Sequence, residues 1–236
     1  MSKLEKVVVI GGTGLIGSKV VKLLEDANHE VVVASTRKGI NAFTGEGLAQ
    51  AVTGADAVID VSNIMSFDKQ ALTEFFGNSS RNLTGAEKAA GVRHHVVLSI
   101  VNADGLAANP YMAGNLGQEE TVAASGQPYP SVRATQFHEF LETLTDAYSA
   151  DGAVKVPDID FQPIAADDVA ATLVEVALGA PKNATIDLAG PERASFETFI
   201  RTYVGAKGDG RPVSADAAVT YVGAPVVTRS VVPNGN

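Results

Sequence analysis

Short apolar runs alternate along the chain with longer segments whose apolar residues recur at helical spacing. The runs are rich in β-branched residues and predict strands at Val7–Ile10, Glu30–Ala34, Ala57–Val61, Val96–Ile100 and Tyr129–Arg133. The periodic segments predict helices at Leu15–Ala27, Glu46–Val52, Lys69–Ala90 and Leu116–Ala124. Several runs are continuously apolar, which is typical of parallel strands covered on both faces. The alternation therefore predicts an α/β fold built on a doubly wound parallel sheet.

The pattern becomes less regular after about residue 137. It predicts helices at Phe137–Tyr148, Ala166–Leu178 and Ser195–Val204, the last with Ser195 as its N-cap, a strand at Thr185–Leu188, and a short extra strand earlier, at Asn41–Thr44. The later pieces are too short for an independent domain. We therefore expect residues 1–236 to form one domain, with a core over about residues 1–136, a substrate-side lobe over about 137–225, and a loose tail at Val226–Asn236.

Charge and composition exclude several kinds of partner. The net charge is −9, and no cluster of Lys and Arg interrupts the 27 acidic residues, which disfavours nucleic acid and an anionic membrane surface. No apolar stretch approaches the ~20 residues needed to cross a bilayer, and the chain runs directly into a strand without a secretion signal. Cysteine is absent and the four histidines lack metal-ligand spacing, so neither disulfides nor a metal site are expected. These features predict a soluble cytoplasmic protein.

Three glycines separate the first predicted strand from the first predicted helix. Such a loop directs unpaired backbone N–H groups at an anion, and the helix dipole adds a favourable potential. Gly11 permits the sharp turn, Gly14 lets a pyrophosphate approach the backbone, and Gly17 allows tight packing of helix on strand. The candidate cofactor-binding residues of this loop are Gly11, Thr13, Gly14, Leu15, Ile16 and Gly17. The sequence therefore predicts a Rossmann-type dinucleotide site.

The end of the second strand indicates which dinucleotide binds. A site for NAD usually places an Asp or Glu there to bind the ribose 2′-hydroxyl, whereas here no carboxylate occurs before Glu46. The segment consists instead of hydroxyls and cations, at Ser35, Thr36, Arg37 and Lys38. Because a guanidinium can bind two phosphate oxygens at once, this favours NADP(H), with NAD(H) the less favoured cofactor.

The ordered set of motifs resembles the atypical short-chain dehydrogenase/reductases, specifically their NmrA-like, NAD(P)-binding branch. The resemblance covers most of the chain and rests on five stretches: GGTGLIG from Gly11, Gly54–Asn63, His94–Asp104, Pro130–Leu141 and Gln162–Ala170. It implies that the cofactor lies across the carboxyl ends of the strands. It also implies that Val61, Ser62 and Asn63 lie beside the ribose and pyrophosphate, Ser99 near the nicotinamide, and Thr135, Gln136 and Phe137 over the nicotinamide side.

The catalytic pattern of the family is present only in part. Dehydrogenases of this type carry Ser, then Tyr-x-x-x-Lys: Tyr donates a proton as hydride arrives, and the Lys cation lowers the pKa of the phenol from ~10. Ser99 and Tyr111 match, but Asn115 stands where the Lys is expected. His138 follows the last core strand and is the one replacement donor that the sequence offers. A half-exposed histidine at a helix start is the alternative interpretation.

Other polar residues have ordinary interpretations. Asp60 is expected to lie in a buried strand and either to orient a turn or to contact the cofactor indirectly. Glu119 and Glu120 are expected on a helix surface, Asp167 and Asp168 in the first turn of a helix, and His94 with His95 at a turn or edge.

The resemblance leaves two functions open. The first is an NADPH-dependent oxidoreductase that transfers hydride to a small, apolar carbonyl or quinone, a small-molecule substrate. The alternative is a non-catalytic redox sensor of the NmrA-like type, which the missing Lys favours. A sugar-nucleotide epimerase fits the glycine motif but not the short C-terminal lobe. The resemblance also leaves a homodimer through Lys69–Ala90 open, which the pattern of that helix does not decide.

Overall fold

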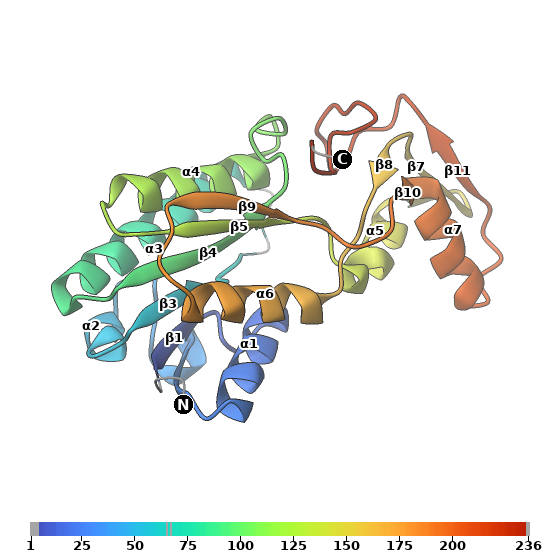
Figure 1. Cartoon of the computed structure of the whole chain (residues 1–236). Coiled ribbons are helices and arrows are strands. Elements are labelled where there is room, and N and C mark those ends of the chain that lie inside the picture. The colour runs from blue at the N-terminus through green and yellow to red at the C-terminus, as the bar shows by residue number, and fades with distance from the viewer. Residues whose placement is uncertain (1–4, 65, 67, 235–236) are drawn as a thin grey trace.

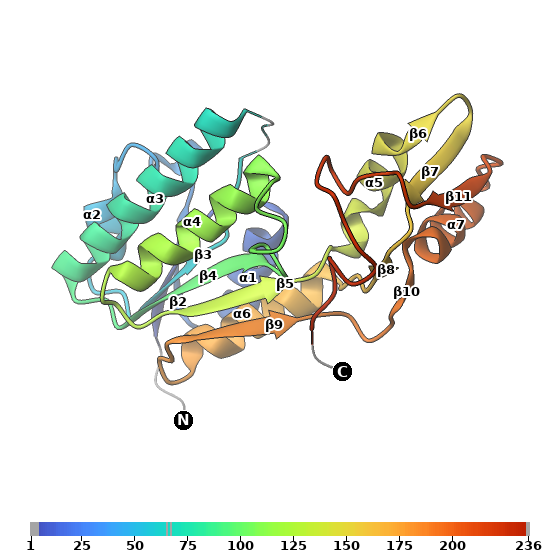
Figure 2. The ribbon, with the colours of Figure 1, turned by 90° about the horizontal axis from the view of Figure 1, so that it is seen from above.

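The centre of the molecule is a parallel β-sheet with helices on both faces (Figures 1 and 2). The computed structural model describes residues 5–64, 66 and 68–234. The sheet has the order β2-β1-β3-β4-β5-β9, and every neighbouring pair is parallel. The strands are β1 Lys6–Ile10, β2 Glu30–Ala34, β3 Ala57–Asp60, β4 His94–Ile100, β5 Pro130–Ala134 and β9 Ala184–Leu188. This confirms the predicted α/β fold with a doubly wound, Rossmann-type sheet.

The two faces of the sheet are covered by different helices. Helices α1 and α6 pack against each other on one face, while α2, α3 and α4 cover the other (Figure 1). These helices are α1 Leu15–Asp26, α2 Leu48–Val52, α3 Lys69–Ala90, α4 Pro110–Ala124 and α6 Ala166–Leu178. The face toward α1 and α6 is apolar, because residues such as Val9, Ile59 and Val96 project there. Strand alternation sends Asp60 and His95 to the opposite face, where both are buried.

A smaller second lobe lies beyond the carboxyl ends of the strands (Figure 2). The chain enters it after β5, returns to the sheet as α6 and β9, and enters it again. Its elements are η2 His138–Phe140, α5 Leu141–Ala147, β6 Ser149–Ala150, β7 Ala153–Pro157, β8 Asp160–Phe161, β10 Ala194–Ser195, α7 Phe196–Ala206 and β11 Val213–Asp216. They share one apolar cluster, in which Phe161 stacks on Phe196 at 4.3 Å between ring centroids.

Several local predictions need correction. Asn41–Thr44 is a turn rather than a strand, because the Asn41 side-chain oxygen accepts hydrogen bonds from the N–H groups of Phe43 and Thr44. Helix α4 begins at Pro110 instead of residue 116, with Asn109 as its N-cap. Helix α2 covers only the last five residues of the helix predicted at Glu46–Val52. The helix predicted from residue 137 begins with the 3₁₀ turn η2. The N-cap role of Ser195 is confirmed, since its hydroxyl accepts from the Thr198 N–H at 3.1 Å.

The C-terminal segment is not a loose tail in its described part, which ends at residue 234. Val231 and Val232 are buried, and the Val232 carbonyl accepts a 2.7 Å hydrogen bond from the Asn102 side chain. The Thr228 carbonyl likewise accepts from the Asp160 N–H at 2.7 Å. Residues 166–188 also differ from expectation, because β9 pairs with the core sheet and α6 packs on its face, so that neither belongs to the lobe.

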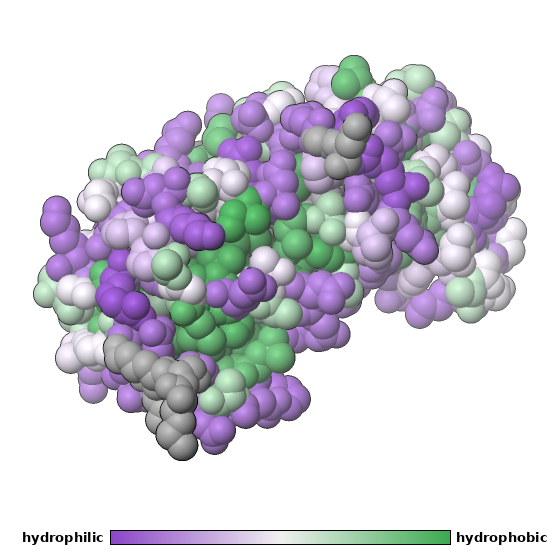
Figure 3. All heavy atoms as spheres, in the orientation of Figure 1, coloured by the Kyte–Doolittle hydropathy of each residue, from purple (hydrophilic) through white to green (hydrophobic). Residues whose placement is uncertain are grey.

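Figure 3 shows apolar side chains gathered across the middle of one face, over the region where β9 and α6 lie in Figure 1. Strand β9 forms an edge of the sheet, and its Ala184, Ile186 and Leu188 are half-buried while Thr185 and Asp187 are exposed. Within the described part of the chain, no helix combines the length and the apolarity needed to cross a membrane.

Candidate cofactor and active site

The glycine loop lies at the point where the strand order reverses, between β1 and β3. Gly11 has a φ of +78°, and a Cβ there would stand 2.9 Å from the Val61 carbonyl oxygen. A Cβ on Gly17 would stand 2.2 Å from the Gly11 carbonyl oxygen. Both positions exclude side chains because backbone atoms of the loop, of α1 and of the segment after β3 approach one another closely. In open α/β sheets, ligands bind at this switch point.

The loop presents unpaired N–H groups at the start of α1. Ser18 donates to the Gly14 carbonyl at 3.0 Å, so the N–H groups of Leu15, Ile16 and Gly17 have no acceptor inside the helix. Gly14 is the N-cap and offers no side-chain oxygen, and no acidic residue lies in the first turn. The positive end of the helix dipole is therefore uncompensated, which favours an anionic group such as a pyrophosphate.

The end of β2 is held against this loop. The N–H groups of Gly11 and Gly12 both donate to the Ala34 carbonyl, at 3.0 and 3.3 Å. Beyond Ala34 the chain forms the 3₁₀ turn η1, Thr36–Lys38, whose residues are exposed. Among the described residues, the side chains of Arg37 and Lys38 have no ion-pair or hydrogen-bond partner, and the Lys38 backbone N–H donates to the Ser35 carbonyl at 2.9 Å. Two cationic side chains without a described partner, those of Arg37 and Lys38, therefore follow the strand end that contacts the glycine loop.

The turn after β3 completes this edge. Val61 donates to the Ile10 carbonyl at 3.0 Å, which fixes the turn beside the glycine loop. The Ser62 N–H donates to Asp60 Oδ1 at 2.9 Å, so Asp60 orients this turn. The Ser62 hydroxyl is buried without a partner in the described residues. The structure therefore brings together the glycine loop, the end of β2 and the segment Val61–Asn63.

Tyr111 contacts the same turn from the first turn of α4. Its hydroxyl donates to Asn63 Oδ1 at 3.0 Å, and its ring meets the edge of Phe76 at 6.1 Å between centroids. Burial raises the pKa of the Tyr111 phenol, and hydrogen bonding with the amides of Asn115 and Asn63 opposes that rise. No cation is among the groups that shift it. Asn115 is itself buried and donates to the Tyr111 carbonyl at 2.9 Å.

Ser99 lies near the end of β4 and is 3% exposed. Its hydroxyl has no hydrogen-bond partner among the described residues. The hydroxyl is therefore available to another donor or acceptor, although no described contact joins Ser99 to Tyr111. The catalytic roles of Ser99 and Tyr111 therefore stay predictions.

The segment after β5 connects the sheet to the second lobe. The Thr135 hydroxyl donates to the Gln162 carbonyl at 2.6 Å, and the Gln136 carbonyl accepts from Ile164. Phe137 stacks on Phe140 at 5.7 Å between centroids. His138 is exposed, and its ring lies 6.3 Å from that of Phe199 on α7. The described contacts of this ring do not include Ser99 or Tyr111.

Several polar residues near the site were assigned wrongly or missed by sequence reasoning. His94 and His95 are fully buried within β4 rather than at an edge, where they bond the Ala177 carbonyl and Glu87 respectively. Glu119 is buried rather than on the surface, and it binds the guanidinium of Arg133 at 2.8 Å. Gln118, which sequence reasoning missed, donates to Asp60 Oδ2 at 2.9 Å. Gln118 follows Tyr111 by seven residues, and this spacing indicates that both side chains lie on one face of a helix.

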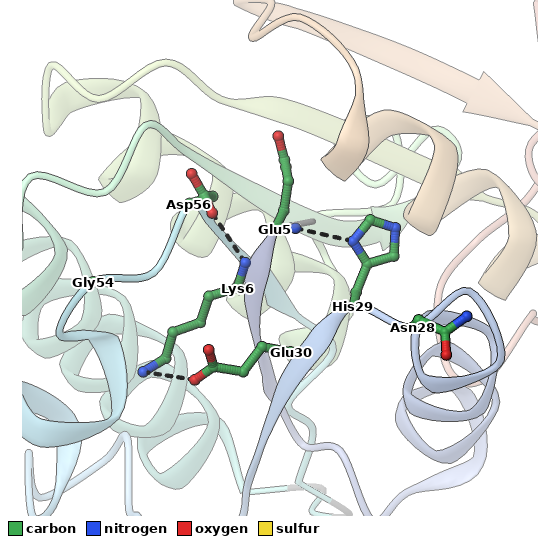
Figure 4. A pocket seen from close by; sticks show the side chains of 7 residues that line it. All are labelled: Glu5, Lys6, Asn28, His29, Glu30, Gly54 and Asp56. Carbon is green, nitrogen blue, oxygen red and sulfur yellow. Dashed lines mark hydrogen bonds and ion pairs between the residues drawn. The ribbon is translucent and has the colours of Figure 1, made fainter. Parts of the chain in front are cut away.

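A depression of about 440 Å³ lies at the other end of the sheet, at the amino ends of β1 and β2 (Figure 4). Its charged groups are paired with one another: Lys6 Nζ lies 3.2 Å from Glu30, and the Lys6 N–H donates to Asp56. The Glu5 N–H donates to a ring nitrogen of His29 at 3.2 Å. Within the described residues no group of His, Asp or Glu is arranged to hold a metal ion. This depression is remote from the glycine loop and is no part of the cofactor site.

The comparison that decides the family is a match of residues 11–179 to a family model described as NAD(P)H-binding. The chain belongs to the NAD(P)H-binding family. The matched region runs from the glycine loop to the end of α6. Membership confirms the predicted dinucleotide-binding family.

This NAD(P)H-binding protein is also similar in sequence to a curated protein. The photosystem II assembly factor Ycf39 of Synechocystis sp. is 28% identical over 173 residues, which are 67% of this chain and 50% of that protein. The chain thus spans about half the length of this curated relative.

Two solved structures share the fold at low sequence identity. The dTDP-4-dehydrorhamnose reductase of Bacillus anthracis, in complex with NADP, is 13% identical with a TM-score of 0.73, over 100% of this chain and 91% of that one. An NADPH-dependent quinone oxidoreductase of Escherichia coli, complexed with NADPH, is 18% identical with a TM-score of 0.69, over 89% and 78%.

Proposed function

We propose that this NAD(P)H-binding protein is an NADPH-dependent reductase that transfers hydride to a small, apolar carbonyl or quinone. The observation that carries the proposal is the Tyr111 hydroxyl, which lies on the cofactor-side turn through its hydrogen bond to Asn63. Its raised pKa keeps the phenol protonated at neutral pH, so it is a neutral proton donor. Carbonyl reduction requires a proton donor beside the dinucleotide site, and the raised pKa makes this phenol a weaker donor than one next to a Lys cation.

The glycine loop, η1 and the turn after β3 are the residues that hold the cofactor in this proposal. The N–H groups of Leu15 and Ile16 bind the pyrophosphate, and Arg37 with Lys38 binds a 2′-phosphate. When bound, NADPH supplies the hydride. Tyr111 then gives its proton to the carbonyl oxygen, and the resulting phenolate takes a proton from solvent. The Ser99 hydroxyl holds the same oxygen.

Quinones suit this site better than ketones do. Hydride addition to a quinone yields an aromatic hydroquinone anion, which needs proton donation less than an alkoxide does. Among the described residues, no cation stabilises the conjugate base of Tyr111, because Asn115 stands in the position of the usual Lys. Placement of the substrate on the cofactor therefore provides most of the catalysis.

The test is steady-state NADPH oxidation across panels of quinones and ketones. Wild-type protein is expected to reduce quinones and, more slowly, ketones. Tyr111→Phe is expected to lower ketone turnover by about 10²–10⁴-fold, the usual contribution of a placed proton donor, with NADPH affinity and quinone turnover within a few-fold. Unchanged ketone turnover in the Phe variant would remove Tyr111 from the mechanism.

A non-catalytic redox sensor is the second candidate, and it is favoured because no cation of the described structure shifts the pKa of Tyr111. A sensor binds the oxidised and reduced dinucleotides differently and turns over no substrate. If the wild type oxidises NADPH with none of the quinones or ketones, yet binds NADP⁺ and NADPH with different affinities, the sensor is the better description.

A further inference from the structure

A hydrogen-bonded pair is buried between the sheet and helix α4. Asp60 on β3 and Gln118 on α4 are each 1% exposed. Asp60 Oδ2 accepts from Gln118 Nε2 at 2.9 Å, and Asp60 Oδ1 accepts from the Ser62 N–H at the same distance. One carboxylate thus binds both the helix and the turn that ends at Asn63.

A buried Asp and Gln stabilise the folded protein less than a pair of apolar side chains would if packing were their only role. A buried carboxylate is unfavourable, since burial raises the pKa of Asp60 in spite of the nearby charge of His95, and apolar residues of similar volume usually pack at least as well. The same face of the sheet shows that alternative nearby, where Val8 and Val58 pack against Leu83. The directional bonds of Asp60 instead specify where α4 lies along and around its own axis.

Helix α4 contacts the turn at a second point. Tyr111 and Gln118 are seven residues apart, so their side chains leave α4 on the same side. The first binds Asn63 at the far end of the turn, and the second binds Asp60 at its beginning. The turn and the helix are therefore held together at both ends.

We propose that Asp60 and Gln118 are positioning residues that fix helix α4 to the Val61–Asn63 turn and so set the place of the Tyr111 hydroxyl relative to the bound dinucleotide. The proposal rests on the proposed reductase function. A shift of about 1 Å between a catalytic group and its substrate can lower turnover by about 10²-fold. The pair thus acts on the chemical step through Tyr111, without touching substrate.

The experiment compares Gln118→Leu with Val122→Ala, a control on the same helix. Val122 is fully buried, and its truncation leaves a cavity under α4 but keeps both contacts with the turn. Gln118→Leu is expected to lower kcat for a ketone about tenfold, with KM for the ketone and Kd for NADPH within about threefold. Val122→Ala is expected to lower Tm and leave kcat within about twofold. Gln118→Met fills the same space with an unbranched chain and replaces the Leu variant if that variant does not fold.

Asp60→Asn is the conservative variant. Its amide oxygen can accept from the Ser62 N–H, and its NH₂ can donate to the Gln118 oxygen once that amide flips. Turnover within about threefold of wild type is expected. An equal loss of kcat in Gln118→Leu and Val122→Ala, or a tenfold loss in Asp60→Asn, would overturn the proposal.

A readout independent of turnover separates this proposal from the reductase function. In Gln118→Leu the Ser62 amide, which donates to Asp60, is expected to exchange with deuterium at least tenfold faster than in Val122→Ala, since the turn has lost its link to α4. If the wild type reduces nothing, the reductase function fails while this exchange still tests the pair. Equal exchange in the two variants would show that the pair does not position the turn.

Discussion

Arg37 is the residue on which the choice of dinucleotide depends most directly. Its guanidinium has no partner in the described structure and follows Ala34, whose carbonyl binds the glycine loop. A charge-assisted hydrogen bond contributes about 1.5–3 kcal/mol, so Arg37→Ala is expected to weaken NADPH binding by about tenfold or more and to spare NADH. Fluorescence titration with both cofactors measures this. Equal wild-type affinity for NADPH and NADH would contradict the prediction.

Asn115 is the residue that separates an ordinary dehydrogenase site from this one. Asn115→Lys introduces a cation one helical turn beyond Tyr111, on the same side of α4. The cation is expected to lower the pKa of the Tyr111 phenol and to raise ketone turnover at neutral pH, because it stabilises the phenolate. Quinone turnover is expected to stay within a few-fold.

The measurement for Asn115→Lys is the pH profile of NADPH oxidation with each substrate class. Tyr111→Phe in the same background is the control, since it removes the group that the cation acts on. An unchanged ketone profile in Asn115→Lys would mean that the cation does not reach the phenol.

At the scale of the element, the junction of β1 and α1 has no room for a methyl group. Gly17→Ala would place its Cβ 2.2 Å from the Gly11 oxygen and 2.7 Å from the Gly12 Cα. The strand and helix must then separate, and we expect a loss of about 1–3 kcal/mol in the free energy of unfolding together with loss of dinucleotide binding.

The matched control for Gly17→Ala lies on α3. Gly85→Ala is a helical substitution with no atom within 4 Å of the new Cβ, so the helix should gain up to about 1 kcal/mol. Chemical denaturation with and without NADPH measures both variants. Normal cofactor binding by Gly17→Ala would show that the loop tolerates the separation.

Elements were predictable from sequence where local signals and burial agree. The glycine loop and the apolar core strands have both, and the structure places them as expected. The start of α4 was missed although Asn109 and Pro110 are ordinary signals of a helix start, because apolar periodicity is weak in its first turn. His95 was misplaced because its partner Glu87 lies on another element, which no pattern along one strand reveals.

At the scale of the whole molecule, the buried pair of His95 and Glu87 makes stability depend on pH. Burial alone would lower the pKa of His95, but the charge and hydrogen bond of Glu87, with the charge of Asp60, raise it above its ordinary value. Folding therefore favours the protonated imidazole. The resulting stabilisation is full below the unfolded pKa of about 6.5 and is lost as pH rises through the folded pKa.

Glu87→Gln tests this dependence because it keeps the shape of the side chain and removes the charge. At pH 6 the variant is expected to be less stable than wild type, and the difference should narrow as the pH rises to 9. Urea denaturation across this range measures it, with Thr84→Ser on the same helix as a control whose difference from wild type stays constant. A gap between Glu87→Gln and wild type that does not change with pH would contradict the assigned pKa direction.

The second lobe is assembled from two stretches of chain with α6 and β9 between them, and this order matters when the protein is synthesised. Phe161 emerges from a ribosome about 35 residues before Phe196, the ring it stacks on. At roughly 5–20 residues per second, that is a delay of roughly 2–7 s. During this interval the nascent chain exposes the apolar side of α5 and β7, and until β9 emerges the sheet also lacks its sixth strand. A ribosome that pauses soon after residue 161 therefore holds an aggregation-prone intermediate, whereas a pause after β9 leaves the sheet complete and only the lobe unfinished.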